Sequence, residues 1–424
     1  MKVLNVLVLS SLLFSSTVFS QDNQNTSLES YLSSLKQQEF SFDYEKNENE
    51  SSKLRDSWIQ PLRLEYSFSR SNPYKNISNS QNARIVIDQP IFQSGGIFYG
   101  IKFAQASRKY NNFSIDVQKR KLIKDTVSLL LQIRQHYYKI EKQNLVIDNA
   151  KINVEQQTER YLSGQLDSGF LDNAIIEANA QYQVLYNFET AQQRLISRYK
   201  ALSDLDYKTA PIPHLSVISQ DDFMQNNYDV YLAQSDAKKR KYNKNIVIAK
   251  YLPKVSISGS YAWDKKDSFA FNDTGAFPGS ETDYYSYGMS ASMPLDFNSI
   301  RDVQSAKVDH LKSLVIIDDK KRELTALYEQ VSQNLQNLDK KKKLAIKNRE
   351  LYEKLYSDTV ALFKAGYKTD YDVKTLNNSV KSQNVEITIL ELDKQLELLD
   401  LYEKLVSSNK QSDTAQVTIA KGNN

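Results

Sequence analysis

Side chains that commonly carry out chemistry are sparse in this sequence. It has no cysteine, which excludes thiol catalysis and a zinc–thiolate site. The three histidines, His136, His214 and His310, are too far apart for a metal-binding spacing and are expected to be structural or exposed. No Ser-His-Asp set, phosphate-binding loop or plausible carboxylate pair can be recognised. The sequence therefore predicts neither an enzyme nor a protein that holds a cofactor or metal.

Charge gives no argument for a nucleic-acid partner. The formal net charge is +4 over 424 residues, which is close to neutral for this length. The basic run Lys340–Lys343 lies in a long helical pattern and is expected to be a solvated helix face. What remains to be explained is the unusual distribution of helix-breaking residues.

Two stretches of the chain lack proline and predict very long helices. No proline occurs between Pro90 and Pro211, and none follows Pro294. A helix over residues 98–163 would be about 100 Å long. In each stretch a glycine, Gly164 or Gly366, marks a turn, after which a second helix returns. We therefore expect helical hairpins at about 98–203 and 299–406.

Apolar residues recur every seven positions in both long helices, which is typical of a coiled-coil seam. In the first helix these residues are Ile133, Ile140, Ile147, Val154 and Tyr161. In the second helix they are Leu324, Val331, Leu338, Ala345 and Tyr352. The pattern predicts that the helices pack side by side as coiled coils.

Four short segments alternate between apolar and polar residues, with the period of two that indicates β-strands. They lie at about 62–69, 84–91, 255–263 and 285–293. One face is rich in Leu, Ile, Tyr and Met, whereas the other is mostly Ser, Gly, Ala or charged. Such a pattern fits a membrane barrel, although a soluble sandwich has the same period. Because four strands are too few for a closed barrel, several chains would have to contribute.

The order of these elements occurs twice, which predicts two repeats. We expect a signal peptide at 1–20, a first repeat at 21–210, a second at 211–406 and a disordered tail at 407–424. Shorter helices should precede each strand pair. We expect a loop at Glu45–Ser52 after the first of them, and a continuous second helix that starts near Asp221 and ends before Pro253. We expect this second leading helix to continue the return helix 170–202 end to end. The N-terminal helix should likewise continue the second return helix.

Several motifs in this order resemble those of the TolC family of outer-membrane channel proteins. The first is Gln89-Pro90-Ile91-Phe92-Gln93-Ser94-Gly95-Gly96 leading into Ala104 and Ala106, with a weaker copy in Met293-Pro294-Leu295 leading into Ala306. The others are the turns Tyr161-x-x-Gly164 and Phe363-x-x-Gly366. The resemblance implies a mixed α and β membrane protein. Three chains would form a homotrimer with one 12-stranded transmembrane barrel and a long periplasmic tunnel of coiled-coil helices.

The resemblance also implies functional positions at the glycine turns. In the family these turns dock a periplasmic adaptor protein, which links the channel to an inner-membrane transporter. The matching residues here are Ser163, Gly164, Gln165, Ala365, Gly366 and Tyr367.

A family acid that lines the closed aperture of the tunnel corresponds to Asp372, beside Lys368, and a second acid is replaced by Thr375. The alternative for Asp372 is an acid that stabilises a helix start. The family's polar ties between hairpins fall on Phe363, Lys368 and Phe170, of which only the lysine could make one.

Two functions fit these features. The first is an exit duct in the outer membrane, with its helices in the periplasm, that serves a tripartite efflux system or type I protein secretion. The alternative is a soluble periplasmic coiled-coil scaffold without a pore. The sequence does not identify the transported substrate.

Overall fold

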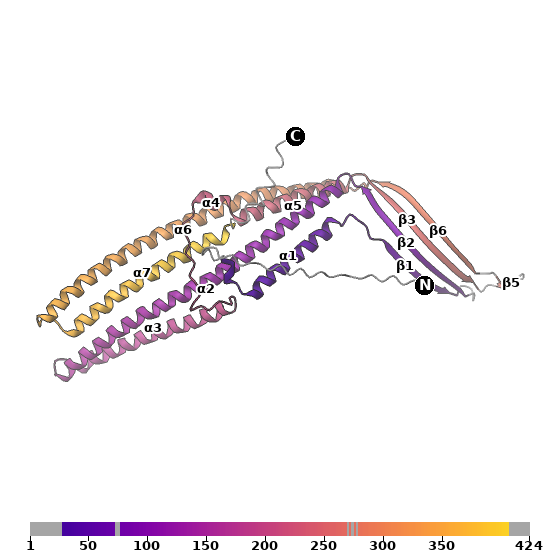
Figure 1. Ribbon diagram of the computed structural model, residues 1–424. Coiled ribbons are helices and arrows are strands. Elements are labelled where there is room, and N and C mark those ends of the chain that lie inside the picture. The colour runs from indigo at the N-terminus through magenta and orange to yellow at the C-terminus, as the bar shows by residue number, and fades with distance from the viewer. Residues whose placement is uncertain (1–27, 73–76, 269–270, 273–274, 277–278, 407–424) are drawn as a thin grey trace, which may run out of the picture.

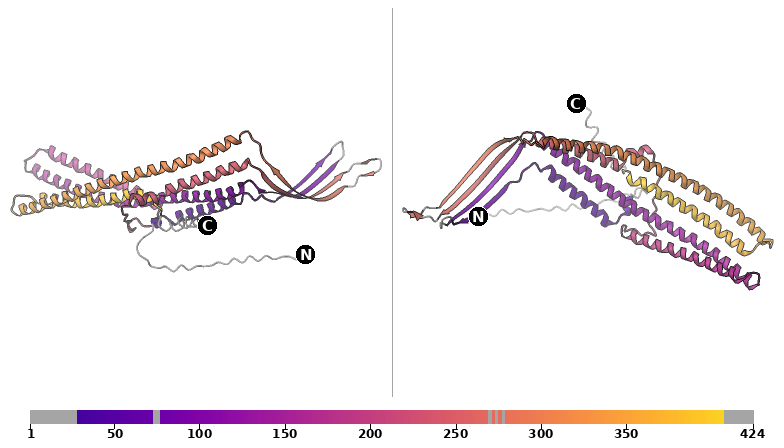
Figure 2. Two further views of the ribbon diagram at one scale, coloured as in Figure 1. Left: turned by 90° about the horizontal axis from the view of Figure 1, so that it is seen from above. Right: turned by 180° about the vertical axis from the view of Figure 1, so that it is seen from behind.

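A computed structural model gives the structure of residues 28–72, 77–268, 271–272, 275–276 and 279–406. The protein is elongated, with long helices at one end and a narrow β-sheet at the other (Figures 1 and 2). The predicted signal peptide at 1–20 and the predicted tail at 407–424 lie outside the described residues.

The sheet has four antiparallel strands in the order β1-β2-β3-β6. These strands are β1 (Arg63–Ser71), β2 (Ser78–Phe92), β3 (Lys254–Ser268) and β6 (Ser280–Ser292). A two-residue pair, β4 (Phe271–Asn272) and β5 (Gly275–Ala276), follows β3. The two predicted hairpins, which are far apart in sequence, therefore join through the β2–β3 pairing.

The strand register sorts apolar and polar residues onto opposite faces, as the sequence alternation predicted. Ile85 pairs with both Leu64 and Tyr261, and Tyr261 pairs in turn with Tyr285. Side chains at such directly paired positions lie on the same face of a sheet. On the opposite face, the Ser260 and Ser286 hydroxyls are 2.8 Å apart.

Strand β2 is longer than the predicted 84–91 and passes through Pro90. Its pairing with β3 shifts register between Pro90 and Phe92. Proline has no amide hydrogen to donate to a neighbouring strand, and such an irregularity is where a strand tolerates it.

Two helices dominate the other end of the molecule, α2 (Gly96–Leu162) with 67 residues and α6 (Ser299–Lys364) with 66. Each returns through an antiparallel partner, α3 (Ser168–Lys200) or α7 (Asp370–Lys404). The remaining helical segments are η1 (Leu28–Tyr31), α1 (Ser34–Arg55), α4 (Gln220–Gln225) and α5 (Tyr228–Lys250).

Most of the predicted heptad positions face neighbouring helices. Ile133, Ile147 and Val331 are at most 3% exposed, as a coiled-coil seam requires. Tyr161 is the clearest exception at 43% exposed, because α2 ends one residue later and little packs over its last turn.

The predicted loop at Glu45–Ser52 is wrong, because this segment lies inside α1. Asn47 is buried against α2, where its side-chain amide donates to the Arg108 carbonyl oxygen at 3.0 Å and to Asn112 Oδ1 at 2.8 Å. These polar partners stabilise a helix that has few apolar residues. Composition alone indicated a loop because the partners are more than 60 residues away in the sequence.

The predicted continuous helix from Asp221 is also wrong, because it breaks between α4 and α5. The break is at Asn226 and Asn227, and the side chain of the buried Asn227 accepts from the Asp229 amide at 2.9 Å. Asparagine is a favoured N-cap residue, and it begins α5 here.

The return helices α3 and α7 stack end to end on the leading helices α1 and α5, and these pairs differ from the predicted ones. The end of α3 meets the start of α1, where the Ser33 amide donates to the Leu202 carbonyl at 2.8 Å. The end of α7 meets the start of α5, where Lys404 Nζ lies 2.9 Å from Asp229 Oδ2. Each return helix therefore continues into the leading helix of its own repeat.

The segment 201–219 explains this pairing because it crosses sideways between the repeats. Tyr31 donates a hydrogen bond to the Pro211 carbonyl at 2.8 Å, and Tyr328 donates to the Ile218 carbonyl at 2.9 Å. Pro211 and Pro213 disfavour a helix in the middle of this segment. The chain thus leaves the end of α3 and reaches the start of α5 beside α7.

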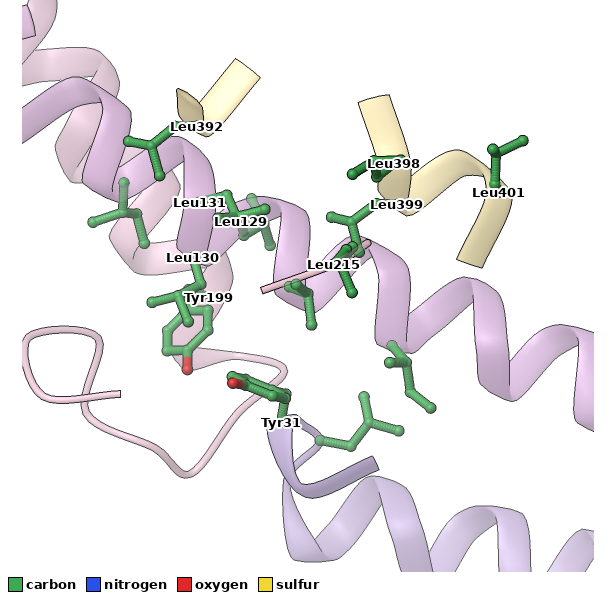
Figure 3. Close-up of a cluster of buried hydrophobic side chains, with 14 of the residues drawn as sticks. Tyr31, Leu129, Leu130, Leu131, Tyr199, Leu215, Leu392, Leu398, Leu399 and Leu401 are labelled. Atoms are coloured by element: carbon green, nitrogen blue, oxygen red, sulfur yellow. The ribbon is translucent and has the colours of Figure 1, made fainter. Parts of the chain in front are cut away.

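A hydrophobic core lies where these helix ends meet (Figure 3). Leu130 of α2 and Leu399 of α7 pack with Tyr31 and Tyr199, all at most 2% exposed. Burying such side chains stabilises the fold by roughly 1.5–3 kcal/mol each. The core holds the helices together near the middle of α2, with the helix tips on one side of it and the sheet on the other.

Candidate functional site at the helix tips and the sheet

The first tip turn, between α2 and α3, is closed by a Schellman motif. Gly164 donates its amide to the Tyr161 carbonyl at 3.0 Å, and Gln165 donates to the Arg160 carbonyl at 2.9 Å. Gly164 has a φ of +69°, which an L-residue adopts only with strain. Ser163, Gly164 and Gln165 are all exposed.

The second tip turn, between α6 and α7, repeats this geometry. Gly366 donates to the Phe363 carbonyl and Tyr367 to the Leu362 carbonyl, both at 2.9 Å, and φ of Gly366 is +81°. Ala365 and Gly366 are exposed, and Tyr367 is 80% exposed. The residues predicted to dock an adaptor thus lie in two exposed turns of the same design.

Asp372 begins α7 as part of a capping box. Its Oδ2 accepts from the Thr369 amide at 3.0 Å and from the Thr369 hydroxyl at 2.8 Å, while its own amide donates back to that hydroxyl. The backbone hydrogen bond from Thr369 is the main reason that the pKa of the Asp372 carboxyl is lowered. The helix-start alternative is therefore present in the structure.

The other two predicted aperture residues lie close to Asp372 in sequence. Lys368 is exposed in the turn, and it contributes to the lowered pKa of Asp372 through its charge. Thr375 is half-buried one turn into α7, and its carbonyl accepts from the Ser379 hydroxyl at 2.9 Å. Phe363 and Phe170, at the family's positions for polar ties, are 42% and 55% exposed.

A set of polar contacts between α2 and α7 was missed by sequence reasoning. At the tip, Tyr371 donates its hydroxyl to Glu159 Oε1 at 2.8 Å, a hydrogen bond that raises the pKa of Tyr371. The further pairs toward the core are Asn378–Asn149, Glu386–Lys142, Asp393–Gln135 and Asp400–Lys124. On α7 these residues recur every seven or eight positions, which is a signal that the sequence did contain.

At the other end, both edges of the sheet lack a partner strand in the described part of the chain. β1 pairs only with β2, and β6 pairs only with β3. The apolar face is uncovered as well: Leu64, Tyr287 and Met289 are 74%, 85% and 75% exposed. Unpaired edges and large apolar patches normally indicate a surface that contacts something else.

The order of the helices matches the order of the strands. Helix α2 packs against α1 and α3 on one side and against α5 and α7 on the other, and α6 packs against α5 and α7. The chain therefore forms one curved layer that runs from α1 and β1 at one side to α6 and β6 at the other (Figure 2). Outer residues on both sides are exposed and apolar, including Phe42 of α1 and Val315 of α6.

Two absences concern the described residues alone: a metal-binding cluster and a membrane-crossing helix. These residues contain no group of three or more His, Cys, Asp or Glu side chains that could hold a metal ion. None of the helices in the same ranges combines the length and apolar character needed to cross a membrane. His214 lines a cavity of about 610 Å³ between the crossing segment and α6–α7, and His136 Nδ1 lies 3.0 Å from the Gln132 carbonyl oxygen.

Comparison with known proteins gives a match in structure only. No protein-family model matches the sequence, and no curated protein matches it either. The structure is similar to the outer membrane protein VceC of Vibrio cholerae, with a TM-score of 0.69 and 15% identity over 90% of this chain and 96% of VceC. The CmeC outer membrane channel of Campylobacter jejuni gives 0.71 and 13%, over 96% of this chain and 93% of CmeC.

A third similar structure is the open state of the MtrE outer membrane channel of Neisseria gonorrhoeae. Its TM-score is 0.60 at 14% identity, over 89% of this chain and 86% of MtrE. At these identities the likeness concerns the fold. This chain has the fold of outer-membrane channel proteins, the fold that its resemblance to the TolC family implied.

Proposed function

We propose that the protein is an outer-membrane channel that acts as the exit duct of a tripartite efflux or type I secretion system. One observation carries the proposal: the four-stranded sheet has one apolar face and one polar face, and neither of its edges has a partner strand among the described residues. In water the exposed apolar face would favour aggregation. In a membrane the same face would contact lipid, and the polar face would line an aqueous pore.

The unpaired edges support assembly from several copies. Strand edges cannot remain open in lipid, because unsatisfied backbone groups cost several kcal/mol each. β1 and β6 are antiparallel neighbours if one copy follows another around a ring, so each copy can supply the strand that the next one lacks. Three copies would give the 12 strands that the family resemblance implies.

The helices would then form a tunnel beneath the barrel. Since α1 and α6 lie at the two sides of one curved layer, the edge that closes the barrel would also close the helical layer. Exposed apolar residues such as Phe42 and Val315 would be buried between copies. We place this tunnel in the periplasm, with the tips directed away from the outer membrane toward an adaptor and an inner-membrane transporter.

The tips would narrow the tunnel and dock the adaptor. We propose Ser163, Gly164, Gln165, Ala365, Gly366 and Tyr367 as docking residues, and Asp372, Lys368 and Thr375 as residues near the aperture. The hydrogen bond between Tyr371 and Glu159 would hold the two hairpins together there, in place of the ties that Phe363 and Phe170 cannot form.

The experiment combines purification from the membrane with electrical recording. The protein extracted from outer membranes in detergent should have the mass of three chains by light scattering, and it should form ion-conducting pores in planar lipid bilayers. Deletion of residues 280–292, which removes β6 and one sheet edge, should abolish conductance. A water-soluble monomer without conductance would contradict the proposal and favour the periplasmic scaffold.

A further inference from the structure

The two tip turns share one backbone design but carry opposite charges. Each presents a large apolar side chain beside its glycine, Leu162 at 78% exposure and Tyr367 at 80%. Residues 159–172 contain Glu159, Arg160, Asp167 and Asp172, for a net charge of −2. Residues 364–374 contain Lys364, Lys368, Lys374, Asp370 and Asp372, for a net charge of +1. The first tip is therefore acidic and the second basic.

The charges nearest the turns are available to a partner. Lys374 is occupied by Asp370, whose Oδ2 lies 2.6 Å from its Nζ. Within the described residues, neither Lys364 nor Asp172 forms an ion pair at 4.0 Å or less, and both are exposed. Asp167 accepts a hydrogen bond from the Gly169 amide at 2.8 Å and is exposed at the turn.

The two tips are held in a fixed relation to each other. Both turns lie at the same end of the molecule (Figure 1). The hydrogen bond from Tyr371 to Glu159 joins the first turn of α7 to the last turns of α2. A partner can therefore contact both tips at once as one surface with an acidic half and a basic half.

We infer that this surface docks a partner surface of opposite polarity, with an acidic residue facing Lys364, a basic residue facing Asp167 and Asp172, and an apolar residue between them. The inference rests on the proposed function, because it assigns this partner surface to the periplasmic adaptor. The backbone of a partner could approach both glycines closely. A Cβ atom placed on Gly164 or Gly366 would have no heavy atom within 4 Å apart from those of its chain neighbours. The apolar residues would supply most of the affinity.

The charges would mainly set the orientation of the partner. Exposed ion pairs add little affinity, but like charges brought together are unfavourable and exclude the reversed arrangement. Two chemically different tips would thus accept such a partner in one direction only.

The test uses photocrosslinking in intact cells that contain the channel and its own transport system. Benzoylphenylalanine is placed at position 367 or at position 162, and the crosslinked partner residues are identified by mass spectrometry. We expect both positions to crosslink to one partner protein, with acidic residues near the contact of position 367 and basic residues near that of position 162.

Charge reversal tests the polarity directly. Lys364→Glu should reduce crosslinking from position 367 by about fivefold, with the loss smaller at high salt. Reversing the acidic partner residue to lysine should restore the yield. The matched control is Lys343→Glu, an exposed lysine of the same helix that makes no ion pair in the described structure and lies far from the tip.

Three outcomes would overturn the inference: equal yields for Lys364→Glu and the control, a partner surface with basic residues at position 367, or crosslinks to a second copy of this chain. Conductance of Lys364→Glu pores in planar bilayers separates the two proposals. Normal conductance together with any of these three outcomes would contradict the docking inference alone. If the unmodified protein forms no pores, the proposed function itself is contradicted.

Discussion

Asp372 illustrates how a single residue can serve the fold and a proposed function at the same position. Its carboxylate closes a capping box with Thr369, so it stabilises the start of α7 whatever else it does. The sequence analysis gave two alternative roles for Asp372, at the aperture and at the helix start, and the structure shows the second. The proposed role in the aperture depends on neighbouring copies and therefore needs its own test.

We expect the second tip to loosen as the pH falls below about 4. The pKa of Asp372 is lowered from its ordinary value of 3.8, mainly by the backbone hydrogen bond from Thr369. A lowered pKa means that the carboxylate stabilises the tip above the unfolded-state pKa, and that this stabilisation is lost as the pH falls through the folded-state pKa. A spin label attached to Tyr367→Cys should become more mobile over that range.

The control for this prediction is Asp372→Asn, which should give a mobile label at neutral pH and little further change in acid. Asp370→Asn changes the neighbouring acid outside the capping box and should keep the low-pH transition. An identical pH profile in Asp372→Asn and the unmodified tip would show that the capping box does not control the turn.

Tyr371→Phe should raise single-channel conductance. The change removes only the hydroxyl that bonds Glu159, so the hairpins lose a tie at the narrow end of the proposed tunnel. Tyr367→Phe is the matched control, because the Tyr367 side chain is exposed and its hydroxyl makes no hydrogen bond within the described residues. Equal conductance of the two variants in planar bilayers would count against a closing role for this contact.

At the scale of elements, the alternation of apolar and polar residues predicted the strands, and heptad spacing predicted how the long helices pack. The alternating residues identified both faces of the sheet, since Leu64, Ile85, Tyr261 and Tyr285 do share a face. Periodicity is a local property, so it survives without knowledge of distant partners. The Schellman turns at Gly164 and Gly366 are local for the same reason.

Elements that depend on distant contacts could not be predicted in this way. Residues Glu45–Ser52 form a helix because Asn47 bonds to α2, and nothing in their own composition indicates that partner. The end-to-end stacking of α3 on α1 and α7 on α5 is set by how segment 201–219 crosses the molecule. Lengths alone were equally compatible with the other pairing.

The proposed environment of the sheet predicts different effects for two adjacent residues of β6. Tyr287→Arg places a charge on the apolar face, which near the bilayer midplane should cost about 2–4 kcal/mol and reduce assembly in the outer membrane. Ser286→Arg places the same charge on the polar face and should assemble normally. Heat-modifiable migration on gels measures assembly, and equal assembly of the two variants would argue against lipid contact.

At the scale of the whole molecule, the proposed assembly would make the described chain one part of a closed object. Its sheet ends in unpaired edges, and its helical layer ends in exposed apolar residues on the same two sides. The sequence indicated that four strands needed partners, but it could not specify which surfaces would meet. The matching order of helices and strands supports closure by the same neighbour in both layers.

Cysteine crosslinking between β1 and β6 tests this central claim most directly, since the native chain has no cysteine. Ser67→Cys on β1 is combined in turn with Ser286→Cys, Ser290→Cys and Ser292→Cys on β6, all on the polar face. Ser67→Cys with Ser258→Cys on the central strand β3 is the control, because β2 and β6 of the same chain flank β3. A disulfide needs Cα atoms about 4.4–6.8 Å apart, so only neighbouring strands can react.

We predict covalent dimers and trimers but nothing larger for at least one edge pair after oxidation in membranes, and only monomers for the control. Monomers for every edge pair, or a ladder that continues beyond three chains, would contradict closure of the sheet by three copies.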